Sequence, residues 1–514
     1  MSRLRRVVNN TAISLAGQVV TWTSTLLLTS AYGRFLGDIK FGELYFAITF
    51  IMLIGFPLEF GFNQQLTRDV AQEPGKALRY FSNTILIKIA LWFVLYGLIL
   101  VIGWLLGYSP EQRVLIAICG VTLLSTSIAN TFAALHYAYE RVLYPAVGTI
   151  LEKGLSALVG IILLRLGAGV QVMAFVLLGG SLINALWQSI WFLRLVGSKF
   201  SIDLALVRDL VRTSIPFLTY GVLGVIYYRL DTVLLSLFTN TAVVGWYGAA
   251  YRLFDTLVFL PNLVILAIMY PVFSKLSNTS EASLKLAIEK SMNFLLFCGI
   301  PIAATMIAAA PNIIGFLYHR SDFIPAMPVL QALAPGLVFL YINTVFSTII
   351  MSTKQEKKIT IMAAAALVFN LELNFIMIPL FQQIGAAVVT SLTELLLLCI
   401  GVAFVPRPLL PFGSLRVGAK AILASLVMCL AILALRNFNI FLLLSVALLA
   451  YLGAATLLGT IPREDIKTLY SSIRHKAQQT LPEIPIPELE VEQDLQADEK
   501  LSTPENVAMT EVRQ

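Results

Sequence analysis

The sequence predicts an all-α polytopic membrane protein. We expect about fourteen transmembrane helices, arranged as two pseudo-symmetric six-helix bundles around a central cavity and followed by two further C-terminal helices. Three observations predict this fold. Of the 514 residues, 58% are hydrophobic and only 13% are charged, long apolar runs recur along the chain, and basic residues gather in every second gap between those runs. A soluble domain carries about 25% charged residues, so the composition excludes one.

Each predicted helix is an apolar run bounded by charged residues, proline or glycine. About 20 residues are enough to cross a bilayer. The runs lie at residues 9–33, 41–66, 80–107, 112–138, 144–165, 170–193, 210–238, 242–273, 286–317, 325–352, 359–380, 384–405, 416–435 and 438–460.

The distribution of charge between the runs predicts the orientation. If the N-terminus lies inside, the predicted outer segments contain only Arg34, Lys40, Arg113, Arg165, Arg320 and Arg436, and the inner segments contain many more basic residues. Cytoplasmic loops carry such an excess. We therefore expect a multi-pass protein of the cytoplasmic membrane with both termini in the cytoplasm. We interpret the basic residues as belonging to loops on the cytoplasmic face rather than to a nucleic-acid-binding surface.

A weak internal repeat predicts the domain organisation. Gly42 and Tyr45 follow the first outer turn, and Gly245 and Tyr247 follow the turn after the seventh helix. Six helices per unit would place both units in the same orientation, with a cavity between them. We expect bundles at residues 1–200 and 201–406, two extra helices at 407–461, and a disordered acidic tail at 462–514, where prolines alternate with acidic residues.

The hairpin formed by the seventh and eighth helices carries four charges near mid-membrane: Arg229, Asp231, Arg252 and Asp255. A charge at this depth costs at least about 2.5–3.5 kcal/mol, so such groups face the protein interior or a watery cavity. The hairpin therefore predicts a polar pathway and a transporter. The alternative is that Arg229 pairs with Asp255, and Arg252 with Asp231, only to join the two helices.

Further ionisable residues lie within other predicted spans. Glu59, Lys88, Glu152 and Lys153 fall in the inner half of the first bundle, and Glu59 and Glu152 are possible coupling carboxylates. The lysines could instead snorkel to the interface. Glu372 and Glu394 are carboxylates with no obvious basic neighbour; each could carry a coupling proton or hydrogen-bond to an adjacent helix. We assign Trp104, Tyr108, Trp246 and Tyr247 to an outer aromatic belt.

Roughly residues 5–460 resemble a known family. An asparagine-bearing first helix (NNTAISLAGQVV) leads into a turn with Leu36, Gly37, Phe41 and Gly42, and Gly61 and Arg68 follow at the inner end of the second helix. These motifs, with YYRLDTVLL and VGWYGAAYRLFD in the second half, resemble polysaccharide biosynthesis flippases, the Wzx-type exporters of oligosaccharide-lipids. That family belongs to the multidrug/oligosaccharidyl-lipid/polysaccharide exporter superfamily.

The resemblance implies a function. A member would translocate an undecaprenyl-diphosphate-linked sugar or oligosaccharide, a precursor of O-antigen, capsule or exopolysaccharide, by alternating access. Its partners would be this glycan lipid, membrane lipid and a polysaccharide polymerase or chain-length machinery. Arg229 and Arg252 would then contact the diphosphate or the glycan, with Asp231 and Asp255 setting their rotamers or holding the empty cavity neutral. Lys88 and Lys153 would receive the diphosphate from the inner leaflet. The two extra helices would line a groove for the polyprenyl tail.

Two other functions stay open at this point. A cation-coupled multidrug exporter of the same superfamily would share the duplicated bundles, but a pump for organic cations should carry an excess of acidic residues in its cavity. An integral-membrane polysaccharide polymerase or ligase would need a catalytic group on a long loop. The predicted outer loops are short, and we find no phosphate-binding GxxxxGK[ST] motif and no metal-ligand spacing. We therefore expect neither an enzyme nor a cofactor or metal site.

Overall fold

A computed structural model of the chain describes residues 3–59, 61–197 and 201–460. It forms two units, Met1–Leu458 and Gly459–Gln514, and the predicted acidic tail lies outside the described residues. The account that follows concerns the first unit. Throughout its described residues the regular elements are helices and there is no strand, which confirms the predicted fold class.

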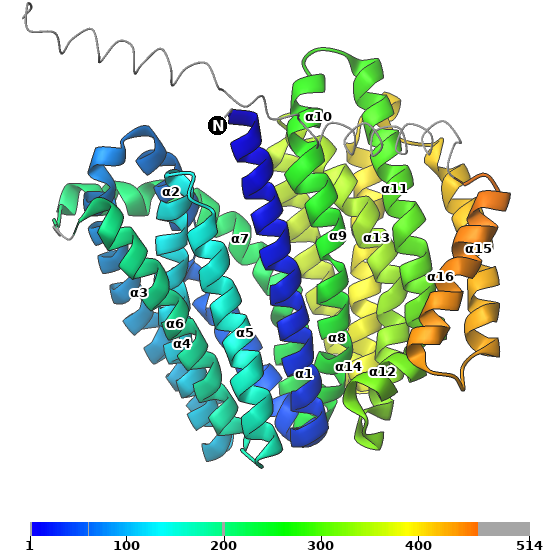
Figure 1. Ribbon diagram of the computed structural model, residues 1–514, viewed down its shortest axis with the longest axis horizontal. Helices are drawn as coiled ribbons and strands as arrows, with labels where there is room; N and C mark the ends of the chain where they lie inside the picture. The colour runs from blue at the N-terminus through cyan, green and yellow to red at the C-terminus, as the bar shows by residue number, and fades with distance from the viewer. Residues whose placement is uncertain (1–2, 60, 198–200, 461–514) are drawn as a thin grey trace, which may run out of the picture. The chain divides into compact units, whose positions relative to one another are not determined.

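In the first bundle the N-terminal helix lies on the side that faces the second bundle (Figure 1). Helix α1 holds two predicted spans, because the backbone at Gly37 has a positive φ of 78° that reverses the chain direction and that glycine adopts without steric cost. The bundle consists of α1 (Arg3–Gly55), α2 (Phe62–Gln72), α3 (Ala77–Leu105), α4 (Pro110–Ala138), α5 (Leu143–Arg165) and α6 (Val170–Val196).

The second bundle contains the charged hairpin and the longest helices of the C-terminal half. It consists of α7 (Leu204–Phe238), α8 (Thr241–Leu257), α9 (Phe259–Pro261), a π-helical stretch (Asn262–Met269), α10 (Tyr270–Leu276), α11 (Glu281–Ala308), α12 (Ala310–Tyr318), α13 (Met327–Ser352) and α14 (Glu356–Phe404). Helix α14 also holds two predicted spans, which meet at Gln382, where φ is 49°.

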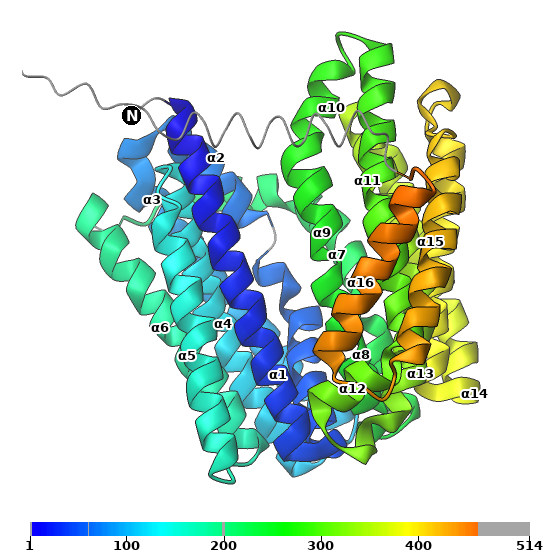
Figure 2. The same cartoon turned by 45° about the vertical axis from the view of Figure 1, so that its right-hand side comes forward.

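The two extra helices form a hairpin beside α11 (Figure 2). They are α15 (Ser414–Ala434) and α16 (Ile440–Leu457). Ala424, Met428 and Ile432 of α15 pack against Leu443 and Tyr451 of α16 in one apolar cluster. The hairpin is therefore a packed part of this unit.

The helix count is compatible with the fourteen predicted spans. Within the part of the chain that the structure describes, eleven helices are long and apolar enough to cross a membrane. Two of these, in α1 and α14, each hold two predicted spans, and the charged helix α7 comes in addition.

Three predicted spans are nevertheless not continuous helices. The predicted span 41–66 stops at Gly55, passes through a 3-10 turn and resumes at Phe62, after Gly61 with a φ of 74°. The predicted span 286–317 breaks before Pro311, which lacks a backbone N–H. The predicted span 242–273 contains the π-helical stretch after Pro261. In each case a proline or a glycine lies at the interruption.

The repeated glycines lie against each other between the two bundles. A Cβ atom on Gly42 of α1 would overlap the Thr241 carbonyl, and one on Gly245 of α8 would overlap the Asp38 carbonyl. Trp246 Nε1 also donates a hydrogen bond to Asp38 Oδ2 at 3.0 Å. Only glycine allows backbones this close, so the pattern that suggested a repeat marks the contact between its two copies.

Candidate functional site

The charged hairpin holds Arg229 in a fixed position. Its guanidinium pairs with Asp255 of α8, with Nη2 3.1 Å from Oδ2, and both side chains are largely buried, at 14% and 15% exposure. The guanidinium carbon lies 5.0 Å and 5.7 Å from the ring centroids of Tyr228 and Tyr251. Tyr228 also donates a hydrogen bond to the other carboxylate oxygen of Asp255 at 2.8 Å. This half of the hairpin has the inter-helix ion pair that the alternative interpretation predicted.

Asp231 binds a tyrosine and not an arginine. Its carboxylate, 3% exposed, accepts hydrogen bonds from the Tyr247 hydroxyl and from the backbone N–H of Thr232 at 2.7 Å. Two predictions are therefore wrong. Asp231 sets no arginine rotamer, and Tyr247, fully buried, does not belong to an outer aromatic belt.

Arg252 has different surroundings from Arg229. Its side chain is half-buried, and among the described residues its guanidinium has no hydrogen-bond or ion-pair partner. The predicted pair between Arg252 and Asp231 does not form. The hydroxyls of Tyr32 and Tyr318 lie within electrostatic range of it, from α1 and α12. Arg252 is thus the arginine of the hairpin that no described residue neutralises.

Buried tyrosines are the feature of this site that sequence reasoning missed. Four buried tyrosines, Tyr32, Tyr45, Tyr247 and Tyr251, and the half-buried Tyr228 lie near the hairpin charges. The hydroxyls of Tyr32 and Tyr45 are buried without a hydrogen-bond partner among the described residues. The YY pair beside Arg229 and the Y-x3-Y spacing in α8, which places two tyrosines on one helix face, were the available signals.

In the first bundle, Lys88 is sealed inside the protein. Its side chain is fully buried, and its Nζ lies 3.1 Å from Asn63 Oδ1, 3.4 Å from the Ser127 carbonyl and 3.8 Å from Glu59. Asn63 donates a hydrogen bond to Glu59 at 2.8 Å. The alternative that Lys88 snorkels to the interface is therefore wrong.

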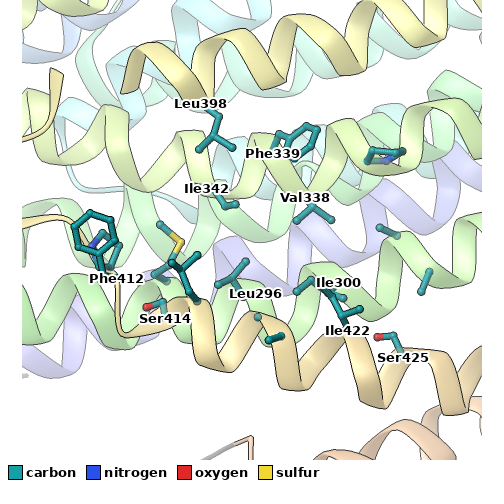
Figure 3. Close-up of a pocket in the computed structure, with 18 of the residues that line it drawn as sticks. Leu296, Ile300, Val338, Phe339, Ile342, Leu398, Phe412, Ser414, Ile422 and Ser425 are labelled. Carbon is teal, nitrogen blue, oxygen red and sulfur yellow. The ribbon is translucent and has the colours of Figure 1, made fainter. Parts of the chain in front are cut away.

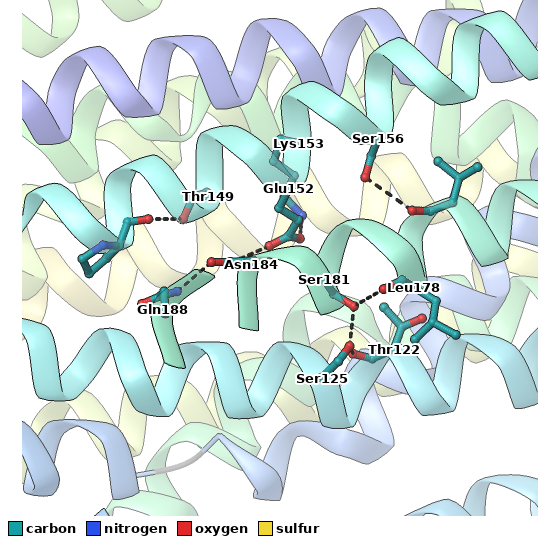
Figure 4. Close-up of polar contacts among 12 residues, drawn as sticks. Thr122, Ser125, Thr149, Glu152, Lys153, Ser156, Leu178, Ser181, Asn184 and Gln188 are labelled. Carbon is teal, nitrogen blue, oxygen red and sulfur yellow. Dashed lines mark hydrogen bonds and ion pairs between the residues drawn. The ribbon is translucent and has the colours of Figure 1, made fainter. Parts of the chain in front are cut away.

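Lys153 and Glu152 begin a polar chain between α5 and α6 (Figure 4). Lys153 Nζ lies 2.6 Å from Glu152 Oε1, and its side chain is 38% exposed. The other Glu152 oxygen accepts a hydrogen bond from Asn184 at 2.8 Å, and Asn184 accepts one from Gln188 at 2.7 Å. A half-exposed ammonium thus connects to a buried row of amides.

The two remaining carboxylates lie in different environments. Glu394 is buried and accepts hydrogen bonds from the Tyr227 hydroxyl at 2.6 Å and from Asn343 Nδ2 at 2.7 Å, as one of its two predicted interpretations requires. Glu372 is exposed and has no partner among the described residues; it lies between Val368 and Ile376, which are also exposed. The described residues contain no cluster of three or more His, Cys, Asp or Glu that could hold a metal ion.

An apolar groove runs beside the helix that carries Arg252. This α8–α16 groove, of about 640 Å³, is lined by residues of α1, α8, α11, α12 and α16, including Leu26, Leu253, Thr256, Leu444 and Tyr451. Thr256 lies one helical turn from Arg252, and its hydroxyl donates a hydrogen bond to the Arg252 carbonyl at 2.9 Å. Arg252 does not itself line the groove, but it lies one turn along α8 from Thr256, which does.

Two family models match this chain. Residues 7–277, more than half of the chain, match the model described as polysaccharide biosynthesis protein, and residues 165–452 match the model of the lipid II flippase MurJ. Among curated proteins, a probable low-salt glycan biosynthesis flippase, Agl15, of Haloferax volcanii is 21% identical over 70% of this chain and 75% of its own length. The probable flippase AglR of the same organism is 24% identical over 76% of this chain and 82% of its own length.

Solved structures share the fold. A lipid II flippase MurJ in an inward closed conformation aligns with a TM-score of 0.69, at 17% identity over 88% of this chain and all of that one. An inward-facing multidrug resistance transporter of the MATE family aligns with a TM-score of 0.54, at 16% identity over 77% of this chain and 94% of that one. Because each family model covers more than half of the sequence, this chain belongs to the polysaccharide biosynthesis protein and lipid II flippase families of the multidrug/oligosaccharidyl-lipid/polysaccharide exporter superfamily.

Proposed function

We propose that this protein is a flippase that moves a polyprenyl-diphosphate-linked glycan across the cytoplasmic membrane by alternating access. One observation carries the proposal. Arg252, half-buried and without an ion-pair partner among the described residues, lies one helical turn from Thr256, a lining residue of the apolar α8–α16 groove. Such a substrate has the two matching parts, an anionic headgroup and a long apolar chain.

The physical barrier explains why these two features belong together. Each unsatisfied polar group in hydrocarbon costs several kcal/mol, so the headgroup needs charge and hydrogen bonds throughout its passage. The planar guanidinium of Arg252 binds two phosphate oxygens at once, while the α8–α16 groove keeps the tail in an apolar environment.

The exposure of the other charged residues decides which role we propose for each of them. Lys153, 38% exposed, is the second proposed phosphate contact, and Glu152 beside it is the best placed of the proposed coupling carboxylates. Arg229 with Asp255, and Lys88 with Glu59, hold the helices that position these contacts. Glu394 is already bound by Tyr227 and Asn343, so we propose a positioning role for it as well.

The proposed transport cycle uses the two bundles, residues 1–200 and 201–406, as moving halves. We infer that the end of the molecule carrying Arg68, Arg79 and Lys275 faces the cytoplasm, as do both termini. The Gly42–Gly245 contact then closes the opposite side and separates when the glycan leaves. A polysaccharide polymerase or chain-length machinery would receive the product there, and the flippase itself would catalyse no covalent reaction.

The test is deletion of the gene followed by mass analysis of lipid-linked sugars. We expect a diphosphate-linked oligosaccharide to accumulate and the wild-type gene to clear it. Arg252→Gln should lower transport roughly ten- to a hundredfold, because a hydrogen bond to a charged group contributes about 1.5–3 kcal/mol. Arg208→Gln, a change of an exposed arginine at the start of α7, is the matched control and should clear the lipid normally.

Two outcomes would contradict the proposal. Normal clearance by Arg252→Gln at equal protein level would remove the proposed contact. Loss of drug resistance without any lipid-linked sugar accumulating would favour the multidrug exporter, whose fold this chain shares.

A further inference from the structure

A second apolar groove lies on the other side of the α15–α16 hairpin (Figure 3). This α13–α15 groove, of about 920 Å³, is enclosed by α11, α13, α14 and α15. Its lining runs from Met292 to Ile307 on α11 and from Ser414 to Cys429 on α15. Fifteen residues of helix rise about 22 Å, so the groove is longer than one leaflet of hydrocarbon, about 15 Å.

The two grooves are independent of each other. They share no lining residue, and neither α1 nor α8 contributes to the α13–α15 groove. It therefore does not lead to Arg252. A substrate whose diphosphate binds Arg252 has its tail beside α8, which leaves the α13–α15 groove for another occupant.

The lining of the groove decides what fits. Apart from Ser414, Ser425, Cys429 and the thioether of Met292, the lining side chains are hydrocarbon, as in Leu296 and Ile422, and hydrocarbon chains suit this lining.

The end of the groove nearest Phe412 carries positive charge. Arg407 and Arg416 are exposed there, and Lys420 lies one turn further along α15, beside the lining residue Ala419. Glu289, next to Gly413, is the nearby carboxylate. Basic pockets between transmembrane helices at the cytoplasmic side bind anionic lipid headgroups.

We propose that the α13–α15 groove binds an anionic diacyl phospholipid of the leaflet at this basic end, with its chains in the groove and its phosphate on Arg407 and Arg416. The lipid fills the space between α15 and the helices α13 and α14, and so holds the hairpin to the second bundle. The choice of this occupant rests on the proposed function, which places the tail of the substrate in the α8–α16 groove, whereas the retention of phospholipid is measured separately from transport.

The test is lipid retention by the purified full-length protein. We exchange it into mixed micelles of phosphatidylglycerol and phosphatidylcholine and count bound lipids by native mass spectrometry. The wild type should retain phosphatidylglycerol preferentially. Arg407→Gln with Arg416→Gln should lower that preference roughly thirtyfold, because each basic residue near a membrane surface contributes about 1 kcal/mol. Arg208→Gln with Arg212→Gln, also exposed and basic but on α7, should leave it unchanged.

A second pair of variants tests the groove itself. Ala419→Trp places a large side chain among the lining residues and should reduce retention of phosphatidylglycerol. Leu430, also on α15, is 68% exposed and does not line the groove, so Leu430→Trp should leave retention unchanged. Equal retention of both lipids by the wild type would overturn the proposal. A second result would also overturn it: a polyprenyl phosphate displaces phosphatidylglycerol from the wild type but not from Ala419→Trp. The groove would then be a second substrate site.

Discussion

Arg229 and Arg252 lie on the two arms of one hairpin, yet their environments differ. Arg229 has a carboxylate at 3.1 Å and two tyrosine rings around its guanidinium, and its side chain is 14% exposed. Arg252 has no ion-pair partner among the described residues and lies beside the α8–α16 groove. The same residue type therefore serves as a structural crosslink on α7 and as an available cation on α8.

The difference shows that a charge within a membrane span does not by itself identify a binding site. What matters is whether the protein already neutralises the charge. A paired, buried arginine must lose its partner before it can bind phosphate, and that loss costs free energy. The predictions that follow test this distinction, and the expected effect on stability decreases from the first to the last.

The largest effect should follow removal of the partner of Arg229. Asp255→Asn leaves a buried guanidinium without a counter-charge, and we expect the free energy of unfolding to fall by about 3 kcal/mol. Thermal unfolding of the purified protein in detergent measures this loss. The double variant Arg229→Gln with Asp255→Asn should be less destabilised than Asp255→Asn alone, since no charge remains unpaired.

That double variant also decides between the two roles of Arg229. If the two single changes were simply additive, no pairing energy would exist, and Arg229 would be as available as Arg252. The proposed difference between a neutralised Arg229 and an unpaired Arg252 would then be wrong.

A smaller loss should follow Tyr247→Phe. This change removes the hydroxyl donor of Asp231, a buried carboxylate, and should lower the free energy of unfolding by about 1–3 kcal/mol. Tyr45→Phe is the matched control, because the Tyr45 hydroxyl is buried without a hydrogen-bond partner among the described residues. Equal losses in the two variants would show that the Tyr247–Asp231 bond contributes nothing.

The depth of these charges could be predicted from the sequence, but their partners could not. Position along a helix follows from residue number at 1.5 Å per residue, so the membrane spans and the depth of the charges in the membrane could be predicted. Direction around the axis changes by about 100° per residue, so Arg229 and Asp231 point to nearly opposite sides of α7. Which neighbour each side chain contacts depends on tertiary packing, which the sequence does not reveal. For the same reason the sequence predicts Tyr247 in the outer aromatic belt, whereas it is buried beside Asp231.

An exposed ion pair should contribute less than either buried contact. Asp203 caps α7 and accepts a hydrogen bond from Arg79, which holds the pKa of its carboxyl below the usual value. A lowered pKa in the folded state adds stability above about pH 4, and that stability disappears as the pH falls through the folded-state value. Arg79→Gln should therefore reduce stability slightly at pH 7 and have no effect at strongly acidic pH. A difference that persisted in acid would point to lost packing rather than lost charge.

Arg252→Gln should have the smallest effect on stability and a large effect on ligand binding. Because no described residue pairs with Arg252, its removal should change the free energy of unfolding by no more than about 0.5 kcal/mol. Binding of a polyprenyl diphosphate, measured by isothermal calorimetry in detergent, should weaken at least tenfold. Arg229→Gln should show the reverse, a clear loss of stability with any weakening of binding explained by unfolding. If instead Arg252→Gln destabilised the protein as much as Arg229→Gln, the unpaired guanidinium would be a structural group like its neighbour, and charge neutralisation would not distinguish the two arms of the hairpin.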